Sequence, residues 1–224
     1  MKTDEARELA EAARTQAAAR RGFCGGLFMG ECEPSRLPGL PAANPEGDAF
    51  LKKVAAVCRE WVDPDEIDRT GEIPDEVLRK LAELGAFGIK IGKEYGGLGL
   101  TQTDYCRAGM LLGSYCGNIT ALISAHQSIG VPQPLIAFGT EEQKRKYLPR
   151  VAKGEISAFA LTEPSVGSDP ARMSTHAEPT ADGTAFVVNG EKLWCTNGTR
   201  AGVLVVMART PAKGVRAVVL SPTR

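Results

Sequence analysis

Residues 159–169 read Phe-Ala-Leu-Thr-Glu-Pro-Ser-Val-Gly-Ser-Asp, and residues 189–197 read Asn-Gly-Glu-Lys-Leu-Trp-Cys-Thr-Asn; these two stretches decide the expected fold. The first predicts a strand that stops at Pro164, because proline lacks the amide hydrogen that a sheet ladder needs. The small residues from Ser165 to Ser168 let backbone N–H groups and a hydroxyl approach a ligand closely. The second predicts another strand, which ends in Trp-Cys-Thr. Two such strand ends are suited to gripping a flat polar ring and a phosphate.

Apolar and polar residues alternate from Ile156 onward, and a period of two indicates strands. The predicted strands cover residues 158–161, 174–178, 185–188, 192–195, 203–208 and 216–220. The residues before Ile156 carry the three-to-four-residue apolar spacing of helices. Helices followed by strands, without alternation, predict an α+β protein. We expect an N-terminal all-α helical-bundle domain and then an antiparallel β-barrel or sandwich domain.

The predicted helices begin and end at recognisable signals. They cover residues 49–61, 74–84, 102–115 and 143–153, with a further helix that opens at Asn118 or Thr120 and ends or kinks near Pro132 and Pro134. Pro64 marks the end of the first helix. Thr101 with Asp104, and Thr140 with Gln143, have the spacing of a capping box, in which each side chain bonds the other's backbone N–H.

Three parts of the chain differ in composition. Residues 1–47 begin with an Ala-, Glu- and Arg-rich stretch, expected to be an exposed helix or a partly ordered tail, and continue as a Gly- and Pro-rich irregular strap. We expect the helical domain to cover residues 48–154 and the β domain residues 155–224. The glycine-rich run at 93–100 lacks the Gly-Lys-Ser/Thr ending of a phosphate loop, so we interpret it as a packing turn.

The composition excludes several functional classes. The 224 residues have a formal net charge of zero, which favours neither nucleic acid nor an anionic membrane surface as a partner. We expect no transmembrane segment, signal peptide or clear transit peptide. Six cysteines without a Cys-x-x-Cys pair, and only two histidines, favour free thiols over a metal site or a disulfide framework. We expect a cytoplasmic location in a bacterium, or the mitochondrial matrix in a eukaryote.

Residues 158–169 and 190–197 together resemble the two flavin-contacting signatures of the acyl-CoA dehydrogenase family. Two signatures in this order and at this separation are far more specific than a lone glycine motif. The runs at 125–130 and 138–149 resemble the same family, and its long- and very-long-chain branch most. The resemblance extends from about Glu46 to the end of the chain.

The resemblance implies FAD as the cofactor and a fatty acyl-CoA thioester as the substrate. In this family a base removes the α proton of the thioester, and the flavin accepts the β hydrogen as a hydride. Electron-transfer flavoprotein is the implied electron acceptor. The family also implies a homodimer or homotetramer at full length, and the sequence does not set the acyl chain length.

Five positions of the first signature are implied to contact the cofactor. Phe159, Leu161 and Thr162 are expected to face the ring system, with the Thr162 hydroxyl as a hydrogen-bond partner. Gly167 and Ser168 are expected near the pyrophosphate and the thioester-side pocket, so Ser168 is also a substrate-binding candidate. Taken singly, each is an ordinary core or turn residue. Phe159 replaces a tyrosine of some relatives and lacks its hydroxyl.

The second signature implies three more cofactor contacts. Trp194 is expected to cover one face of the flavin ring, and Thr196 to offer its hydroxyl near the hydride-accepting nitrogen. Cys195 lies between them as a small apolar strand residue, an interpretation favoured over a nucleophile because no basic partner is evident. For His126, packing with one hydrogen bond on a helix is favoured over a place beside the acyl-chain pocket.

No catalytic residue is assigned in this chain. The family's base is a glutamate of a C-terminal helical domain, and by resemblance Glu163 is not that base. The sequence resembles a family member truncated at Arg224, with that helical domain absent, so we expect the 224 residues alone not to turn over acyl-CoA. Two alternatives of the same fold stay open: a non-catalytic scaffold or assembly protein, and a flavin monooxygenase.

Overall fold

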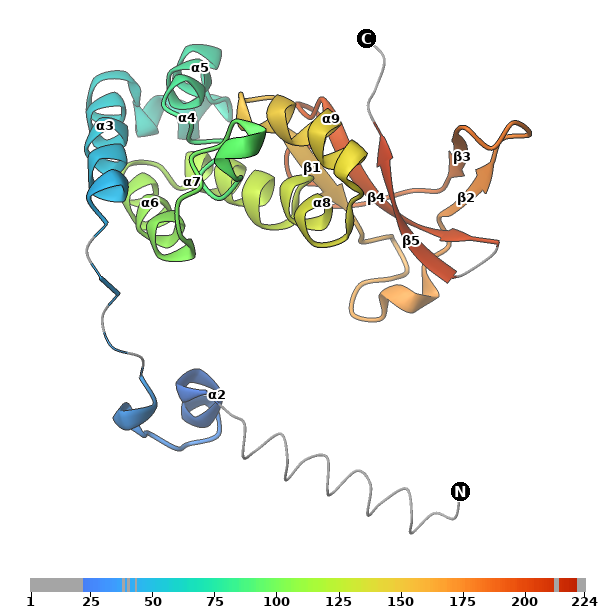
Figure 1. Cartoon of the computed structure of the whole chain (residues 1–224), viewed down its shortest axis with the longest axis horizontal. Helices are drawn as coiled ribbons and strands as arrows, with labels where there is room; N and C mark the ends of the chain where they lie inside the picture. Colours follow the sequence, from blue (N-terminus) through green and yellow to red (C-terminus); the bar gives the residue numbers. More distant parts are fainter. Residues whose placement is uncertain (1–21, 38, 40, 43, 212–213, 221–224) are drawn as a thin grey trace. The chain divides into compact units, whose positions relative to one another are not determined.

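The computed structural model describes residues 22–37, 39, 41–42, 44–211 and 214–220, and the chain divides into two units, Met1–Ala43 and Asn44–Arg224 (Figure 1). In the first unit, helix α2 (Phe23–Phe28) and the 3-10 turn η1 (Pro34–Arg36) add short regular elements to the segment expected to be irregular. The helix or tail expected over residues 1–21 lies outside the described residues.

Helices fill the first part of the second unit, as the apolar spacing predicted. They are α3 (Pro45–Trp61), α4 (Pro64–Thr70), α5 (Asp75–Glu83), η2 (Lys93–Tyr95), α6 (Gln102–Tyr115), α7 (Gly117–Ser124), the π-helix η3 (Ala125–Ile129), α8 (Pro132–Phe138) and α9 (Glu141–Ala152). One buried apolar cluster joins α3, α5, α6 and α7, with Val54, Leu81 and Leu112 at its centre. In the described part of the chain, no helix has both the length and the apolar character needed to cross a bilayer.

Both predicted capping boxes are confirmed, at the starts of α6 and α9. The first box also ties down another helix, because the Asp104 carboxylate accepts a hydrogen bond of 2.6 Å from Asn44 Nδ2, just before α3. Gly47 in the first turn of α3 packs against this carboxylate, where a Cβ atom would clash. Helix α3 therefore starts at Pro45, three residues earlier than its predicted Asp48 cap.

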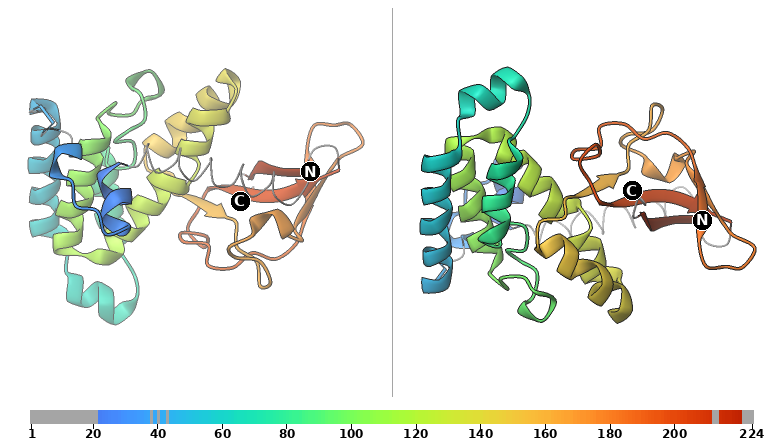
Figure 2. Two further views of the ribbon diagram at one scale, coloured as in Figure 1. Left: turned by 90° about the horizontal axis from the view of Figure 1, so that it is seen from below. Right: turned by 90° about the horizontal axis from the view of Figure 1, so that it is seen from above.

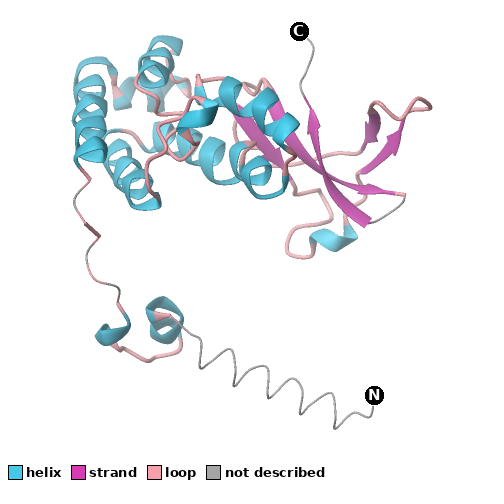
Figure 3. Ribbon diagram, in the orientation of Figure 1, coloured by secondary structure: helices cyan, strands magenta, loops and turns pink. Residues whose placement is uncertain are grey.

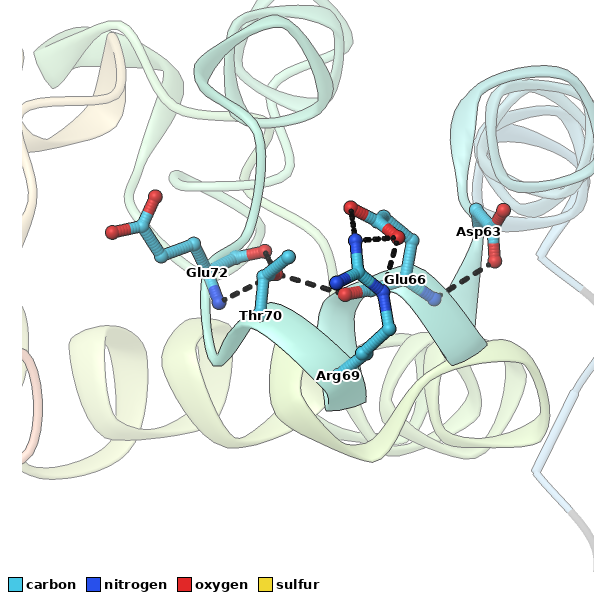
Figure 4. Close-up of polar contacts among 5 residues, drawn as sticks. All are labelled: Asp63, Glu66, Arg69, Thr70 and Glu72. Carbon is cyan, nitrogen blue, oxygen red and sulfur yellow. Dashed lines mark hydrogen bonds and ion pairs between the residues drawn. The ribbon is translucent and has the colours of Figure 1, made fainter.

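Helix α4 was missed by the sequence analysis, which treated Pro64 only as the end of the preceding helix. Asp63 caps α4, since its carboxylate accepts a bond of 3.0 Å from Glu66 N (Figure 4). At the other end Thr70 Oγ1 donates to Glu66 O at 2.8 Å, and Gly71 terminates the helix in the left-handed conformation. The signal was an Asp-Pro pair followed by two acidic residues, a helix start.

The run at 93–100 is a packing turn, as predicted, because its backbone folds back on the preceding residues. Leu98 N donates to Gly88 O, and Leu100 N to Ile89 O. Downstream, α7 runs into η3, which holds one residue more per turn than an α-helix. The predicted end near Pro132 is confirmed, because η3 ends at Ile129, and Pro132 then occupies the first position of α8.

The strands form one mixed sheet after the helices. They are β1 (Ser157–Ala160), β2 (His176–Pro179), β3 (Phe186–Asn189), β4 (Val203–Thr210) and β5 (Gly214–Leu220). The order is β1-β4-β2-β3, and β5 pairs with β4. Two further views (Figure 2) and the colouring by secondary structure (Figure 3) show the strands at one end of this unit. Helices α8 and α9 pack against the sheet through residues such as Leu135, Leu148 and Val203.

The sheet corrects the prediction of an antiparallel barrel or sandwich. Strand β4 runs parallel to β1, with Ser157 opposite Val203, and antiparallel to β5. Within the described residues the sheet is open rather than closed. Alternation along a strand indicates that it is a strand, but not the direction of its partner. The long connection between β1 and β4 permits the crossover that parallel pairing needs.

His126, in the π-helix, joins the helices to the sheet. Its Nδ1 accepts from Ser157 N at 3.0 Å, so the proton of the neutral ring lies on Nε2, which donates to Phe87 O at 3.0 Å. The ring is fully buried and packs edge-on against Phe87. The favoured packing role is thus confirmed, with both ring nitrogens bonded. Burial lowers the pKa of His126 to about 4, despite the opposing effect of the backbone hydrogen bond to Phe87.

Asn197, in the second signature, bonds to both sides of the same junction. Its Nδ2 donates to Leu122 O on α7 at 3.0 Å and to Ser157 O on β1 at 3.2 Å. Its backbone is left-handed, with φ of 68°, which costs other non-glycine residues more than it costs Asn. One side chain therefore attaches the second signature to a helix and to the first strand.

We predict that acid destabilises the protein through His126. Between pH 6.5 and about 4 the unfolded ring takes up a proton that the folded ring does not, so the free energy of unfolding falls as the pH falls through this window. The loss is on the order of 3 kcal/mol for this group. Urea unfolding at several pH values should show a steeper decline for the wild type than for His126→Gln. Identical pH dependence of the two proteins would contradict the assignment.

We predict that Asn197→Ala destabilises the protein more than Asn197→Gly. Both changes remove the bonds to Leu122 and Ser157, for a loss of about 1–3 kcal/mol. Alanine also pays for the left-handed backbone, roughly 1 kcal/mol more. Denaturant melts of both variants measure the difference, and a glycine variant less stable than the alanine variant would refute the backbone contribution.

Candidate functional site

The first signature begins within β1 and then folds into a short closed loop. Glu163 and Val166 exchange backbone hydrogen bonds of 3.0 and 3.1 Å, with Pro164 and the next residue exposed at the tip. Strand β1 has already ended at Ala160, four residues before the predicted stop at Pro164. Gly167 and Ser168 come directly after the loop and are exposed, and the space where a side chain on Gly167 would begin is open.

Residues 192–195 of the second signature lie beside residues 159–163 of the first. Lys192 Nζ donates to Leu161 O at 2.9 Å, and Leu193 N donates to Thr162 O at 2.8 Å. Farther along, Cys195 Sγ contacts Phe159 O at 3.4 Å. The structure thus brings together segments that lie about thirty residues apart in the sequence.

The strand predicted over 192–195 is not present, and this prediction was wrong. The backbone bond between Leu193 and Thr162 is followed by Trp194 in the left-handed region, with φ of 56°, which breaks an extended ladder. Residues 196–200 then form turns, closed by bonds such as Gly198 N to Cys195 O at 2.8 Å. Apolar residues at every second position do not produce a strand here, because the left-handed backbone at Trp194 interrupts the extended conformation.

Trp194 combines backbone strain with exposure. Its side chain is 86% exposed, although an indole normally buries a large apolar surface. The left-handed conformation costs a bulky residue roughly 1–2 kcal/mol. Strained, exposed aromatic residues of this kind are found at ligand sites, where the surrounding bonds maintain them.

The predicted cofactor contacts fall into two groups by burial. Half-buried are Phe159, Leu161, Thr162 and Cys195, and exposed are Gly167, Ser168, Trp194 and Thr196. The half-buried group forms the floor between the signatures, and the exposed group supplies an aromatic face, two hydroxyls and an open glycine. Burial raises the pKa of the Cys195 thiol, which opposes a nucleophilic role.

Glu163 is a buried residue whose role the sequence analysis did not identify. Its carboxylate is 2% exposed and lies 2.8 Å from Lys192 Nζ. Burial alone raises the pKa of such a carboxyl, but hydrogen bonds from Lys192, Thr175 and Ser174 outweigh it and hold the pKa well below its usual range. The available signal was an acidic residue inside the first signature, Glu163, and a single basic residue, Lys192, in the second.

The arrangement can bind a flat, partly polar ligand, but its buried charged pair is not free to act as an acid or a base. Glu163 and Lys192 neutralise each other beneath the surface. An exposed indole, two exposed hydroxyls and a glycine with open space beside it suit a ring and a phosphate, the two chemical parts of a dinucleotide. In the described residues, no group of three or more His, Cys, Asp or Glu side chains is placed to hold a metal ion.

Two known proteins that are similar to this chain in sequence are both described as acyl-CoA dehydrogenases. "Probable acyl-CoA dehydrogenase FadE10" of Mycobacterium tuberculosis is 47% identical over 211 residues, which cover 93% of this chain and 32% of that protein. The human mitochondrial "very long-chain specific acyl-CoA dehydrogenase" is 39% identical over 197 residues, 85% of this chain and 30% of that protein. The chain thus spans about a third of the length of the curated relatives it matches.

Solved structures show the same fold. An acyl-CoA dehydrogenase from Bacillus anthracis, complexed with FAD, has a TM-score of 0.70 at 34% identity and covers 80% of this chain and 31% of that chain. Butyryl-CoA dehydrogenase from Megasphaera elsdenii has a TM-score of 0.73 at 31% identity. The match covers 81% of this chain and 50% of that chain.

Two sequence families account for nearly all of the second unit. The N-terminal domain of acyl-CoA dehydrogenase matches residues 44–155, and the middle domain matches residues 158–224. The change from one to the other falls at the start of β1, where the helices give way to the sheet. On these matches the chain belongs to the acyl-CoA dehydrogenase family.

Proposed function

We propose that the whole protein is an FAD-dependent dehydrogenase that desaturates a fatty acyl-CoA thioester between its α and β carbons. The observation that carries this proposal is the meeting of the two signatures at Thr162 and Leu193, beside the strained, exposed Trp194. Family membership supports it. In this proposal residues 48–154 form the helical domain, and residues 155–224 belong to the domain that contacts the flavin.

The eight predicted cofactor contacts come from both signatures, five from the first and three from the second. Phe159, Leu161 and Thr162 are assigned to the ring system, and Gly167 and Ser168 to the pyrophosphate. Ser168 is also assigned to the thioester side of the pocket. These assignments fit the half-buried floor and the exposed, open glycine loop described above.

The second signature completes the site in this proposal. Trp194 covers one face of the ring, Cys195 lines the floor, and the Thr196 hydroxyl lies toward the hydride-accepting side. Because the backbone is bent at Trp194, its side chain points out into solvent instead of packing in the core. The indole is therefore already exposed for stacking, so little ordering is needed on binding.

The chemistry divides between the cofactor and the protein. FAD, when bound, supplies the acceptor for the β hydrogen of the substrate. The described residues bind and orient the cofactor and the substrate, and they exclude water from the site. Fixing the reacting groups in this way lowers the activation barrier. We assign the base to no residue of this chain. By family resemblance we place it on a glutamate outside the 224 residues.

An electron-transfer flavoprotein is the proposed acceptor for the reduced enzyme. One structurally similar chain belongs to a solved structure titled "Electron transferring flavoprotein of Acidaminococcus fermentans", with a TM-score of 0.75 at 32% identity. Assembly as a homodimer or homotetramer is part of the same proposal. Cytoplasm in bacteria or mitochondrial matrix in eukaryotes is the proposed location.

The function is tested on protein expressed at the full length that its gene encodes. We expect a bound-flavin absorption spectrum, and reduction of an artificial electron acceptor that depends on added fatty acyl-CoA. Bound FAD without turnover on acyl-CoA of any chain length would support the scaffold alternative instead. Oxygen-dependent hydroxylation by the reduced flavin would identify a monooxygenase. Either outcome overturns the proposed dehydrogenase activity.

We predict that Ser168→Ala combined with Trp194→Ala weakens FAD binding about 10- to 100-fold, because stacking and a hydroxyl contact are both lost. Fluorescence titration of FAD measures the Kd. The control is Trp61→Ala, which removes the other tryptophan of the chain. Trp61 lies on α3, where Lys80 Nζ is 4.8 Å from the centroid of its ring. A Kd unchanged in the double variant, or weakened equally in the control, would contradict the assignment.

A further inference from the structure

We propose that Glu163 and Lys192 are positioning residues for the cofactor: their buried ion pair fixes the two signature segments against each other, and FAD binding depends on it. The proposal rests on the proposed function, because it concerns the same FAD site. Neither residue is assigned a contact with FAD or a proton-transfer role.

The Glu163 carboxylate is held by donors from two other segments. Oε2 accepts from Ser174 N at 2.6 Å and from Ser174 Oγ at 2.7 Å. Oε1 accepts from Thr175 N at 2.9 Å and from Lys192 Nζ at 2.8 Å. These four bonds satisfy a carboxylate that is 2% exposed. A buried charge needs such complete pairing, so the surrounding backbone has little freedom to move.

The Lys192 ammonium extends this pairing to the first signature itself. Besides Glu163 it bonds Leu161 O at 2.9 Å, and its side chain is only 10% exposed. The next residue, Leu193, bonds Thr162 through its backbone. Two adjacent residues of the second signature are therefore locked to three adjacent residues of the first.

The bonds that join Lys192 and Leu193 to residues 161–163 are adjacent in sequence to the proposed cofactor contacts. On one side, the Glu163 backbone closes the loop with Val166 that precedes Gly167 and Ser168. On the other, Leu193 precedes the strained Trp194. Loss of the ion pair frees both signatures at once, and the indole and the glycine loop no longer keep one relative position.

Glu163 is unsuited to act as a base, which leaves positioning as its role. Its oxygens are occupied by four donors, and these hydrogen bonds hold the pKa of Glu163 well below its usual range. A general base must instead be free to take a proton from the substrate. The pair also has no exposed face on which substrate could bind directly.

The test compares FAD binding by wild type, Lys192→Met, Lys192→Arg and Glu163→Gln in protein expressed at full gene length. Each protein is first shown to be folded by far-ultraviolet circular dichroism. FAD affinity is then measured by fluorescence titration, and visible circular dichroism reports the asymmetric surroundings of the bound flavin. Lys93→Met is the control, since it breaks the exposed Lys93–Glu46 ion pair.

We expect Lys192→Met and Glu163→Gln to bind FAD about 10- to 100-fold more weakly, the range typical when groups that orient a ligand's contacts are removed. Their visible circular dichroism should also change. Lys192→Arg keeps the positive charge and N–H donors for the Glu163 carboxylate, so it should bind FAD more tightly than Lys192→Met does. Lys93→Met should match wild type in both measurements. Rescue by arginine separates positioning from simple loss of side-chain packing.

A variant that unfolds does not end the test. Glu163→Leu combined with Lys192→Met removes both charges, and an apolar pair avoids leaving one buried charge unpaired. If this double variant is folded and binds FAD as wild type does, with the same visible circular dichroism, the inference is overturned. Weaker binding by the folded double variant supports it. If wild type itself binds no FAD, the proposed function fails; if wild type binds and the variants bind equally well, only this inference fails.

Discussion

A carboxylate out of contact with water requires hydrogen-bond donors, and the candidate site is built around the donors that reach Glu163. They come from Ser174 and Thr175 just before β2 and from the second signature, so one buried charge draws three separate segments together. Lys192 then bonds the first signature through Leu161 O. The exposed residues of the site rest on this paired layer, which explains how a surface of turns keeps a defined shape.

The same constraint operates where the helices meet the sheet. His126 and Asn197 are polar side chains in the junction, and each bonds backbone groups from both sides of it. The π-helix adds a residue to the turn that carries His126, at the point where β1 begins to pair. Because β1 leads into the first signature and Asn197 ends the second, the same segments hold the junction and the candidate site.

Local signals were enough to predict much of the fold, and contacts between distant residues account for the errors. Thr101 and Thr140 cap helices through neighbours three residues away, so sequence spacing identified them. The direction of β4 depends on its partner β1, which no local pattern reveals. The stretch 192–195 has strand-like spacing, but the left-handed backbone of Trp194 breaks the ladder. In the site, family signatures indicated the exposed residues but not the ion pair behind them.

Trp194 shows why the two layers belong together. A strained, exposed indole persists only where the surrounding structure maintains it, and here the support is the bonded layer of Leu161, Thr162, Lys192 and Leu193. Amide hydrogen exchange with and without FAD tests this account most directly. The account predicts the largest slowing of exchange on FAD binding in two separate stretches, residues 161–168 and 193–197. Slowing confined to one stretch, or centred on another part of the chain, would contradict a single site built from both signatures.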